Sequence, residues 1–316
     1  MKIIKIFFWN CGLAHLDNAR PSYTDIQKVM SIIQILMEEK DGDIIVLCEV
    51  NSYVCEIFKH NFSNYIISGL NTRSTPNSHF DMISISKTSV EIKNVLYIRQ
   101  SNLSEEQEKI EKSERFLPNS GRTMKVGVDI TFSVKNISNY FNLIVSHWSS
   151  RMNGFSDENR EESGEALKFY VRKLVEKKSQ VILMGDYNDP PNSISIEHKL
   201  GAINNRYYAS IDARRIYNPS YSFFVPHKPY YNGEKQHFHG TWLSKKDTIR
   251  KNQKISCQVL DQVMVTSSFI NSGPWYLDEK NTRVISDEKI MNLLYDGTID
   301  HLPITINLSH LIQIEE

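Results

Sequence analysis

The chain contains 316 residues, and its 37 Lys and Arg residues balance its 37 Asp and Glu residues. This length is enough for a large buried core. A zero net charge excludes a general electrostatic attraction to nucleic acid, though not a local basic strip. The four cysteines form neither a CxxC pair nor a dense framework, so we expect free buried thiols in a reducing compartment. Residues 1–9 are too short and interrupted for a signal peptide, and no apolar run nears the roughly 18 residues of a membrane span, so the sequence predicts a cytoplasmic protein.

The first predicted strands each bring a polar residue to their end. Residues Lys2–Trp9 are mostly β-branched or aromatic, which is typical of a strand, and Asn10 follows directly. Apolar residues then recur at helical spacing through residues 21–40. A second apolar run, Asp43–Val50, contains Glu49 near its end. Because a buried carboxylate is costly without a partner, either a metal ion or a structural salt bridge is expected beside it.

Two further strands are predicted before the middle of the chain. Phe80–Ser86 and Met124–Val134 have the composition of strands, and residues 104–115 are typical of a charged surface helix or loop. Arg122 stands just before the second of these strands. A guanidinium at this place can clamp a phosphate, and a surface ion pair explains it equally well.

A strand and a long helix follow. Residues Asn142–Trp148 form an apolar run that contains His147, which is either a catalytic group or a core histidine. Residues Asp157–Lys178 predict a helix whose acidic side chains come early, as the helix dipole prefers.

The strongest local signal comes directly after this helix. The four apolar residues Val181–Met184 predict a strand buried on both faces. Asp186 and Asn188 come next, and residues two apart in an extended chain point to the same side. A carboxylate beside a carboxamide suits a proton acceptor next to a donor for developing negative charge. Both residues are also common turn formers.

Residues 192–256 are rich in aromatic residues, lack a clean periodicity and include a basic strip at 245–254. Aromatic groups among cations can stack bases and hold phosphates, or they can pack a long loop onto the body. His237 and His239 have no Cys and no third ligand beside them, which argues against zinc. We expect a variable substrate loop at about 192–256.

The last predicted strands carry acidic groups. Val259–Val265 contains Asp261, and the pair Asp300 and His301 precedes a closing strand. No internal repeat, low-complexity tract or linker interrupts the pattern. We therefore expect one domain over residues 1–316.

Polar residues of catalytic type thus stand at or near the ends of many predicted strands. They are Asn10, Glu49, His147, Asp186, Asn188, Asp261, Asp300 and His301. Carboxylates, amides and histidines without a lysine or serine nucleophile can bind a hard divalent ion through oxygen and activate water against a phosphate ester.

Six short motifs that contain these residues resemble, in order, those of the endonuclease/exonuclease/phosphatase superfamily, which includes deoxyribonuclease I. They are Trp9-Asn10, Leu47-Cys48-Glu49-Val50, Ser146-His147-Trp148, Gly185-Asp186-Tyr187-Asn188, Leu260-Asp261-Gln262-Val263 and Ile299-Asp300-His301-Leu302-Pro303. The resemblance covers nearly the whole chain. It implies an α/β fold, a four-layer α/β sandwich in which two mixed β-sheets pack face to face with helices outside.

The resemblance also implies a metal site and a charged histidine. Glu49 would be the principal metal ligand, with Asn10 and Asp300 close to the ion or its waters. The ion would be Mg2+, with Mn2+ as a substitute. His301 would contact the scissile phosphate, and Asp261 would keep its imidazole oriented and charged.

The remaining candidate residues match positions with other roles. Asp186 would position or deprotonate the attacking water, or assist the leaving group. Asn188 and Arg122 would contact phosphoryl oxygens, and His147 would be the general acid or a second phosphate contact. The usual glutamine before the metal-binding glutamate is Cys48 here, which affects packing more than chemistry.

The favoured function is a Mg2+-dependent phosphodiesterase that acts as a DNA endonuclease or exonuclease, because the basic strip and its aromatic neighbours suit nucleic acid. The alternative is a phosphatase or phosphodiesterase for a phosphoinositide, a sphingomyelin-like lipid or a small phosphorylated metabolite, with residues 192–256 closing over the site. A catalytically inactive binding module is disfavoured, since no expected catalytic position carries an inert residue.

Overall fold

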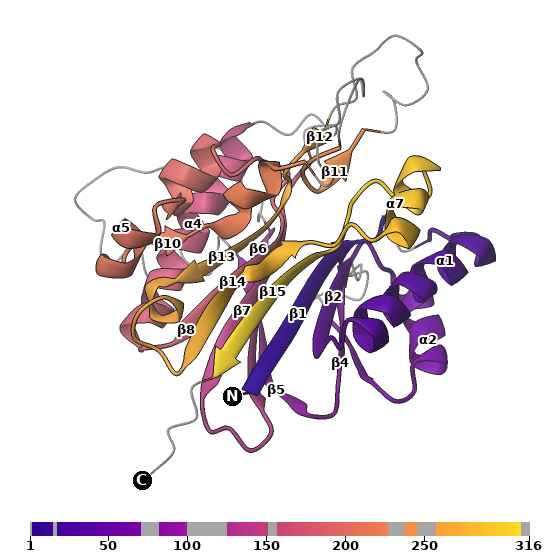
Figure 1. The fold of residues 1–316 in the computed structure, drawn as a ribbon, viewed down its shortest axis with the longest axis horizontal. Helices are drawn as coiled ribbons and strands as arrows, with labels where there is room; N and C mark the ends of the chain where they lie inside the picture. Colours follow the sequence, from indigo (N-terminus) through magenta and orange to yellow (C-terminus); the bar gives the residue numbers. More distant parts are fainter. Residues whose placement is uncertain are drawn as a thin grey trace.

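The computed structural model describes residues 2–14, 18–70, 82–99, 125–150, 157–226, 238–244 and 257–310. Four features of the sequence lie outside these residues: the charged segment 104–115, Arg122, the basic strip at 245–254, and His237. The described residues form two large β-sheets and a set of surrounding helices (Figure 1).

In the described part of the chain, the first sheet has six strands in the order β14–β15–β1–β2–β4–β3. They are β1 (Lys2–Asn10), β2 (Ile44–Cys48), β3 (Ile66–Gly69), β4 (Met82–Ser86), β14 (Trp275–Val284) and β15 (Ile304–His310). The sheet is mixed, because β1 pairs antiparallel with β15 and parallel with β2. The register of β1 and β2 sets Asn10 beside Cys48, so Glu49 follows at the same edge.

The second sheet contains seven of the described strands, in the order β5–β6–β7–β8–β13–β10–β9. They are β5 (Val90–Arg99), β6 (Lys125–Val134), β7 (Tyr140–His147), β8 (Gln180–Asp186), β9 (Ala202–Ile203), β10 (Ile216–Tyr217) and β13 (Asp261–Thr266). β7 and β8 are parallel, whereas β8 and β13 are antiparallel. Two short strands, β11 (Trp242–Leu243) and β12 (Cys257–Gln258), pair separately.

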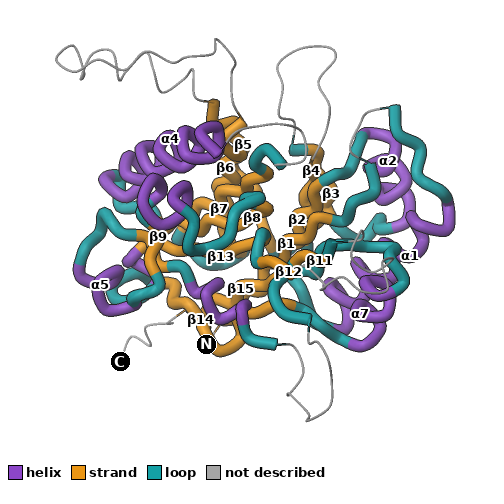
Figure 2. Tube along the Cα trace, turned by 90° about the horizontal axis from the view of Figure 1, so that it is seen from above, coloured by secondary structure: helices purple, strands orange, loops and turns teal. Residues whose placement is uncertain are grey.

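Helices lie outside both sheets. The described helical elements are α1 (Tyr23–Gln34), η1 (Ile35–Glu39), α2 (Ser52–Asn61), α4 (Asp157–Glu176), η3 (Ile194–Leu200), α5 (Arg206–Ile211), η4 (Pro219–Phe224), η5 (Ser267–Phe269) and α7 (Glu288–Tyr295). Figures 1 and 2 show α1, α2 and α7 on the side of the first sheet, and α4 and α5 on the side of the second. The predicted four-layer α/β architecture is confirmed. Within the described residues, no helix has the length and apolarity needed to span a membrane.

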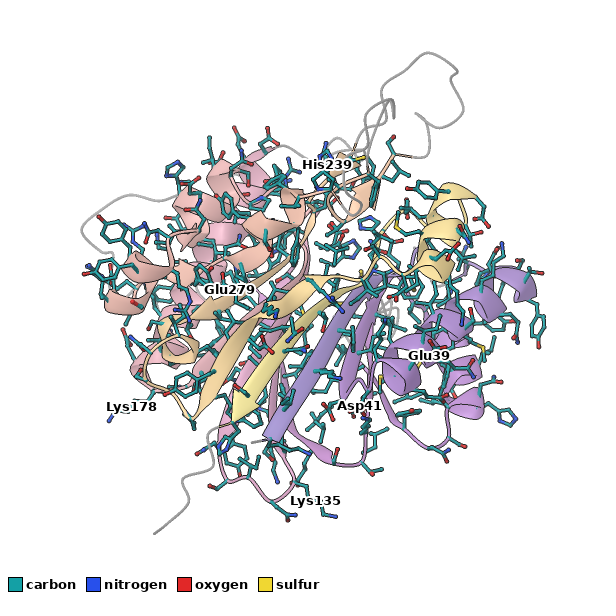
Figure 3. All side chains as sticks on the ribbon, in the orientation of Figure 1. Glu39, Asp41, Lys135, Lys178, His239 and Glu279 are labelled. Atoms are coloured by element: carbon teal, nitrogen blue, oxygen red, sulfur yellow. The ribbon has the colours of Figure 1, made fainter. Side chains whose placement is uncertain are left out.

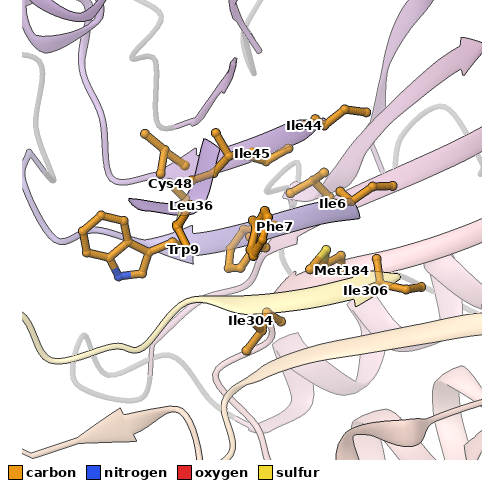
Figure 4. Packing of buried hydrophobic residues seen from close by; sticks show 14 of the residues in the cluster. Ile6, Phe7, Trp9, Leu36, Ile44, Ile45, Cys48, Met184, Ile304 and Ile306 are labelled. Atoms are coloured by element: carbon orange, nitrogen blue, oxygen red, sulfur yellow. The ribbon is translucent and has the colours of Figure 1, made fainter. Parts of the chain in front are cut away.

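The core explains why β8 has four apolar residues in a row. Ile182 and Met184 face the larger apolar cluster between the two sheets, and Figure 4 shows Met184 near Ile306 of the first sheet. Val181 and Leu183 face a second cluster, which the helix α4 covers. Because side chains alternate along a strand, a strand between two apolar layers needs apolar residues at every position.

The predicted helix at 21–40 is observed as α1, which continues into the π-helical turn η1. Ser22 begins it, since its Oγ accepts the backbone N–H of Asp25 at 3.1 Å. Residues 192–226 form η3, β9, α5, β10 and η4. The elements here are short or are not α-helical, which is why this segment shows no period in the sequence.

Candidate active site

The structure brings the described candidate residues to one end of the two sheets. Asn10, His147 and Asp186 are the last residues of β1, β7 and β8, and Asp261 is the first residue of β13. Strand pairing aligns His147 with Asp186, and Asp186 with Asp261, in one row across the second sheet. The other candidates are in adjoining loops: Glu49 after β2, Asn188 after β8, and Asp300 and His301 before β15.

Asn10 connects acidic groups of the two sheets. Its Nδ2 donates to Asp186 Oδ2 at 3.0 Å and to Glu49 Oε1 at 3.2 Å. Its Oδ1 accepts the backbone N–H of Gly12 at 3.2 Å, so the orientation of the amide is fixed. Asp186 is 1% exposed, and its Oδ1 accepts the backbone N–H of Asn188 at 2.9 Å. Asn10 therefore fixes two carboxylates without neutralising either of them.

His301 and Asp261 form a buried pair beside Asp186. His301 Nδ1 lies 2.8 Å from Asp261 Oδ2, and a carboxylate accepts only, so this nitrogen carries the proton. The opposite ring nitrogen, Nε2, lies 3.9 Å from Asp186 Oδ2. The imidazole thus presents Nε2 toward the central carboxylate.

The electrostatics of this pair favour its ionised form. Burial lowers the pKa of His301, but the charges of Asp261 and Asp186 outweigh burial and raise the pKa to about 10. Burial raises the pKa of Asp261 to about 6, against the lowering effect of His301. Between these values the pair is an imidazolium facing a carboxylate. A fixed positive charge of this kind is suited to hold a phosphate oxygen.

Thr241, which no sequence pattern marks as a site residue, holds this pair in place. Thr241 Oγ1 accepts the backbone N–H groups of Leu260 at 3.0 Å and Asp261 at 2.9 Å. The Thr241 carbonyl oxygen accepts the backbone N–H of Leu302 at 2.8 Å, next to His301. Thr241 belongs to the stretch that leads into β11, where Figure 3 labels His239. No local pattern marks Thr241, because its partners are distant in the sequence.

Glu49 and Asp300 border a space beside Gly12. A β-carbon on Gly12 would lie 3.5 Å from Asp300 Oδ1 and 3.9 Å from Glu49 Oε2, so both carboxylates face this position. Glu49 has a φ of 59°, a conformation that costs a residue with a side chain about 1–3 kcal/mol. Its Oε1 also lies 3.8 Å from His147 Nε2. The backbone is thus held in an unfavourable conformation at a residue whose carboxylate contacts Asn10 and lies near His147.

The donor set suits a hard cation. Two carboxylates and a neighbouring amide offer oxygen ligands, which Mg2+ and Mn2+ prefer. The nearby thiols are unsuited to a soft metal, because burial raises the pKa of Cys11 to about 12 and that of Cys48 well above its usual value. The carboxylates of Glu49 and Asp300 are therefore a candidate metal position.

A second group of possible ligand atoms belongs to Asp186, Asp261 and His301, which lie within 4.8 Å of one another and are buried. In this group Nδ1 of His301 is bonded to Asp261. With no metal bound, the raised pKa of His301 keeps its imidazole protonated at neutral pH, and a protonated imidazole has no lone pair for a metal. This group is better suited to hold a proton than a cation.

Asn188 joins the loops after β7 and β8. Its Nδ2 donates to the Trp148 carbonyl oxygen at 2.9 Å, and its φ is 52°. An amide group has two N–H bonds, so one N–H is used here and the other can serve a substrate. His147 is partly exposed beside this loop. The described candidates therefore lie at the same end of the two sheets, and Arg122 lies outside the described residues.

Comparisons with known proteins agree with this architecture. TDP2 from D. rerio, solved in complex with single-strand DNA product, matches with a TM-score of 0.60 and 16% identity over 98% of this chain and 100% of that chain. The human Nocturnin catalytic domain with bound sulfate anion matches with a TM-score of 0.59 and 15% identity, over 98% of this chain and 95% of that chain. A functionally unknown conserved protein from Enterococcus faecalis V583 matches with a TM-score of 0.60 and 12% identity, over 98% of this chain and 100% of that chain. No curated protein matches the chain.

At these identities the likeness to solved structures shows the fold alone. Family membership is carried by the sequence instead, because the profile of the Endonuclease/Exonuclease/phosphatase family matches residues 17–310. This match confirms the resemblance to that family, and five of the six motifs lie within the matched residues. The chain therefore belongs to the endonuclease/exonuclease/phosphatase family.

Proposed function

We propose that this protein is a Mg2+-dependent phosphodiesterase that cleaves DNA as an endonuclease or exonuclease. The observation that supports this most is the meeting of the ionised His301–Asp261 pair with the carboxylate of Asp186. The Glu49 and Asp300 carboxylates beside Gly12 add a position for the metal. A cation and an imidazolium that hold the phosphate, together with a carboxylate that accepts a proton from water, promote the hydrolysis of a phosphate ester.

Each described candidate has a role in this proposal. Mg2+ held by Glu49 and Asp300, with Asn10 beside them, would supply positive charge to the phosphate. His301 donates from Nε2 to a phosphate oxygen, and Asp261 keeps the imidazole charged and oriented.

The groups on the second sheet act on the water, the phosphate and the leaving oxygen. Asp186 accepts a hydrogen bond from the attacking water and takes up its proton as the bond to phosphorus forms. The remaining N–H of Asn188 contacts a phosphate oxygen, while His147 gives a proton to the leaving oxygen as the bond between that oxygen and phosphorus breaks. Arg122 is proposed as a further phosphate contact from its sequence position.

The choice of DNA rests on two points. The aromatic residues and the basic strip at 245–254 can bind bases and phosphates, and TDP2 from D. rerio was solved with single-strand DNA product. The neutral net charge favours the second candidate, an enzyme for a phosphoinositide, a sphingomyelin-like lipid or a small phosphorylated metabolite.

A substrate panel decides between the two candidates. Purified protein with Mg2+ is incubated with supercoiled plasmid, linear duplex DNA, single-stranded DNA, RNA and a phosphoinositide set. We expect nicking or shortening of DNA, and no reaction after chelation of the metal. Release of phosphate or headgroup from the small esters alone, with DNA intact, would overturn the DNA assignment and support the second candidate.

The metal position has its own test. We expect Glu49→Gln to weaken Mg2+ and Mn2+ binding at least about tenfold in titration calorimetry, which corresponds to about 1.4 kcal/mol. The reason is that the change removes one negative charge but keeps the shape of the side chain. Glu176→Gln is the matched control, because Glu176 is an exposed residue at the far end of α4. Equal metal affinities in the wild type and both variants would show that Glu49 is not a metal ligand.

A further inference from the structure

Arg160 is a buried cation on a helix that is otherwise rich in exposed charges. Its side chain is 1% exposed, although α4 lies on the outside of the second sheet (Figure 1). Taking a charge out of water is costly unless partners compensate. Nη1 donates to the Ser149 carbonyl oxygen at 3.1 Å, and Nε lies 3.1 Å from Asp189 Oδ1. The Asp157 carboxylate, in the same helix, pairs with Nη2.

Two of these partners belong to the loops after β7 and β8, the first of which follows His147 and the second of which contains Asn188. Ser149 is the second residue after the end of β7, and Asp189 directly follows Asn188. Asn188 links the same two loops again, because its Nδ2 donates to the Trp148 carbonyl oxygen. Arg160 therefore joins the two loops from the helix side, and Asn188 joins them within the candidate site.

Asp189 is also bonded on its other sides. Its Oδ2 accepts from Ser195 Oγ at 2.6 Å, and its carbonyl oxygen accepts from Gln262 Nε2 at 2.7 Å. Gln262 follows Asp261 in β13. The ion pair of Arg160 and Asp189 thus connects α4, the loop after β8 and the strand that begins with a candidate catalytic acid.

We propose that Arg160 is a positioning residue, which holds His147 and Asn188 in place around Asp186. The inference rests on the proposed function, since it concerns the geometry of that same site. A planar guanidinium can reach several acceptors at once, whereas the ammonium of lysine is a single point charge. Without this contact the two loops can shift, and a displacement of about 1 Å in a catalytic group costs about 10²-fold in rate.

The test compares Arg160→Met, Arg160→Lys and Asp189→Asn with Arg172→Met. Arg172 is the matched control, because it is an exposed arginine on the same helix. Turnover of bis(p-nitrophenyl) phosphate with Mg2+ is measured together with thermal unfolding. We expect Arg160→Met to lower kcat about 10–100-fold with little change in KM. Arg160→Lys should recover part of the loss, and Arg172→Met should match the wild type.

Comparing the change in kcat with the change in melting temperature decides whether Arg160 positions the site or serves folding only. A lower melting temperature with wild-type kcat in both Arg160 variants would mean that this residue serves folding only, which overturns the proposal. If Arg160→Met does not fold, Arg160→Lys decides: a kcat about tenfold lower supports positioning, and an unchanged kcat overturns it. The double variant Arg160→Met/Asp189→Asn should be no less stable than Arg160→Met, since it also removes the buried negative charge that Arg160 balanced.

A crystal structure of Arg160→Lys separates this inference from the proposed function. We expect the loops after β7 and β8 to be displaced, with the contact between Asn188 and Trp148 lengthened. Undisplaced loops overturn the positioning role whatever the activity. An inactive wild-type protein whose variant still shows displaced loops would overturn the proposed function and support the role of Arg160 in holding the loops.

Discussion

Replacing Asp186 with asparagine is expected to lower phosphodiesterase turnover by about 10²–10⁴-fold, the range for loss of a positioned acid or base. Both carboxylate oxygens of Asp186 already accept an N–H, from Asn10 and from the backbone of Asn188. An asparagine must present its own N–H₂ to one of these donors. The change therefore removes the proton acceptor and sets a donor against a donor.

This clash predicts a second, smaller effect on the same variant. Leaving a buried donor without an acceptor costs about 1–3 kcal/mol, so we expect a lower melting temperature as well as lost turnover. Asp129→Asn is the matched control. Asp129 is also buried in the second sheet, where Asn142 and Tyr170 donate to it, away from the candidate site. It should lose stability and keep turnover. Wild-type turnover in Asp186→Asn would show that Asp186 takes no part in the reaction.

Features that depend on a single strand could be predicted from the sequence. The run Val181–Met184 predicts a strand buried on both faces, and β8 lies between two apolar clusters. The polar end of the strand follows from the same pattern, because Asp186 is the first polar residue after the apolar run. The apolar run that becomes β2 predicts the place of Glu49 in the same way, directly after the strand, but its φ of 59° has no signature in the pattern.

Features that depend on contacts between distant segments were missed. Arg160 stands among acidic residues of α4 and has the sequence context of a solvent-exposed residue, yet it is buried against the loops after β7 and β8. Thr241 lies in an aromatic stretch, and its hydroxyl accepts two backbone N–H groups at the start of β13. Neither side chain is apolar or periodic, so only the packing of the layers reveals what each contacts.

The charge of His301 is the other property with a large expected effect. Burial alone would lower the pKa of His301, and the Asp261 carboxylate at 2.8 Å is the largest influence that raises it, to about 10. Asparagine at position 261 can still accept from Nδ1 but carries no charge. We therefore expect the pKa of His301 in Asp261→Asn to fall by several units toward or below its ordinary value of about 6.5.

This shift can be followed without substrate or metal. In the metal-free wild-type protein the His301 imidazole should stay protonated from pH 6 to pH 9 in NMR titrations, with its signal assigned by its loss in His301→Gln. In Asp261→Asn it should lose its proton within or below that range, while Asp129→Asn leaves the signal unchanged. A His301 that stays charged in Asp261→Asn would show that Asp186, at 3.9 Å, suffices to hold the proton.

The consequence for activity has a definite sign. Because the neutral imidazole cannot present a positive charge to the phosphate, turnover of Asp261→Asn at pH 8 should be about 10²-fold or more below that of the wild type. Lowering the pH toward 6 returns the proton to His301, so the variant should recover part of its rate there. The wild type, whose pair ionises above about pH 6, should not gain. A ratio of variant to wild-type rate that is constant from pH 6 to pH 9 would mean that Asp261 orients His301 without setting its charge.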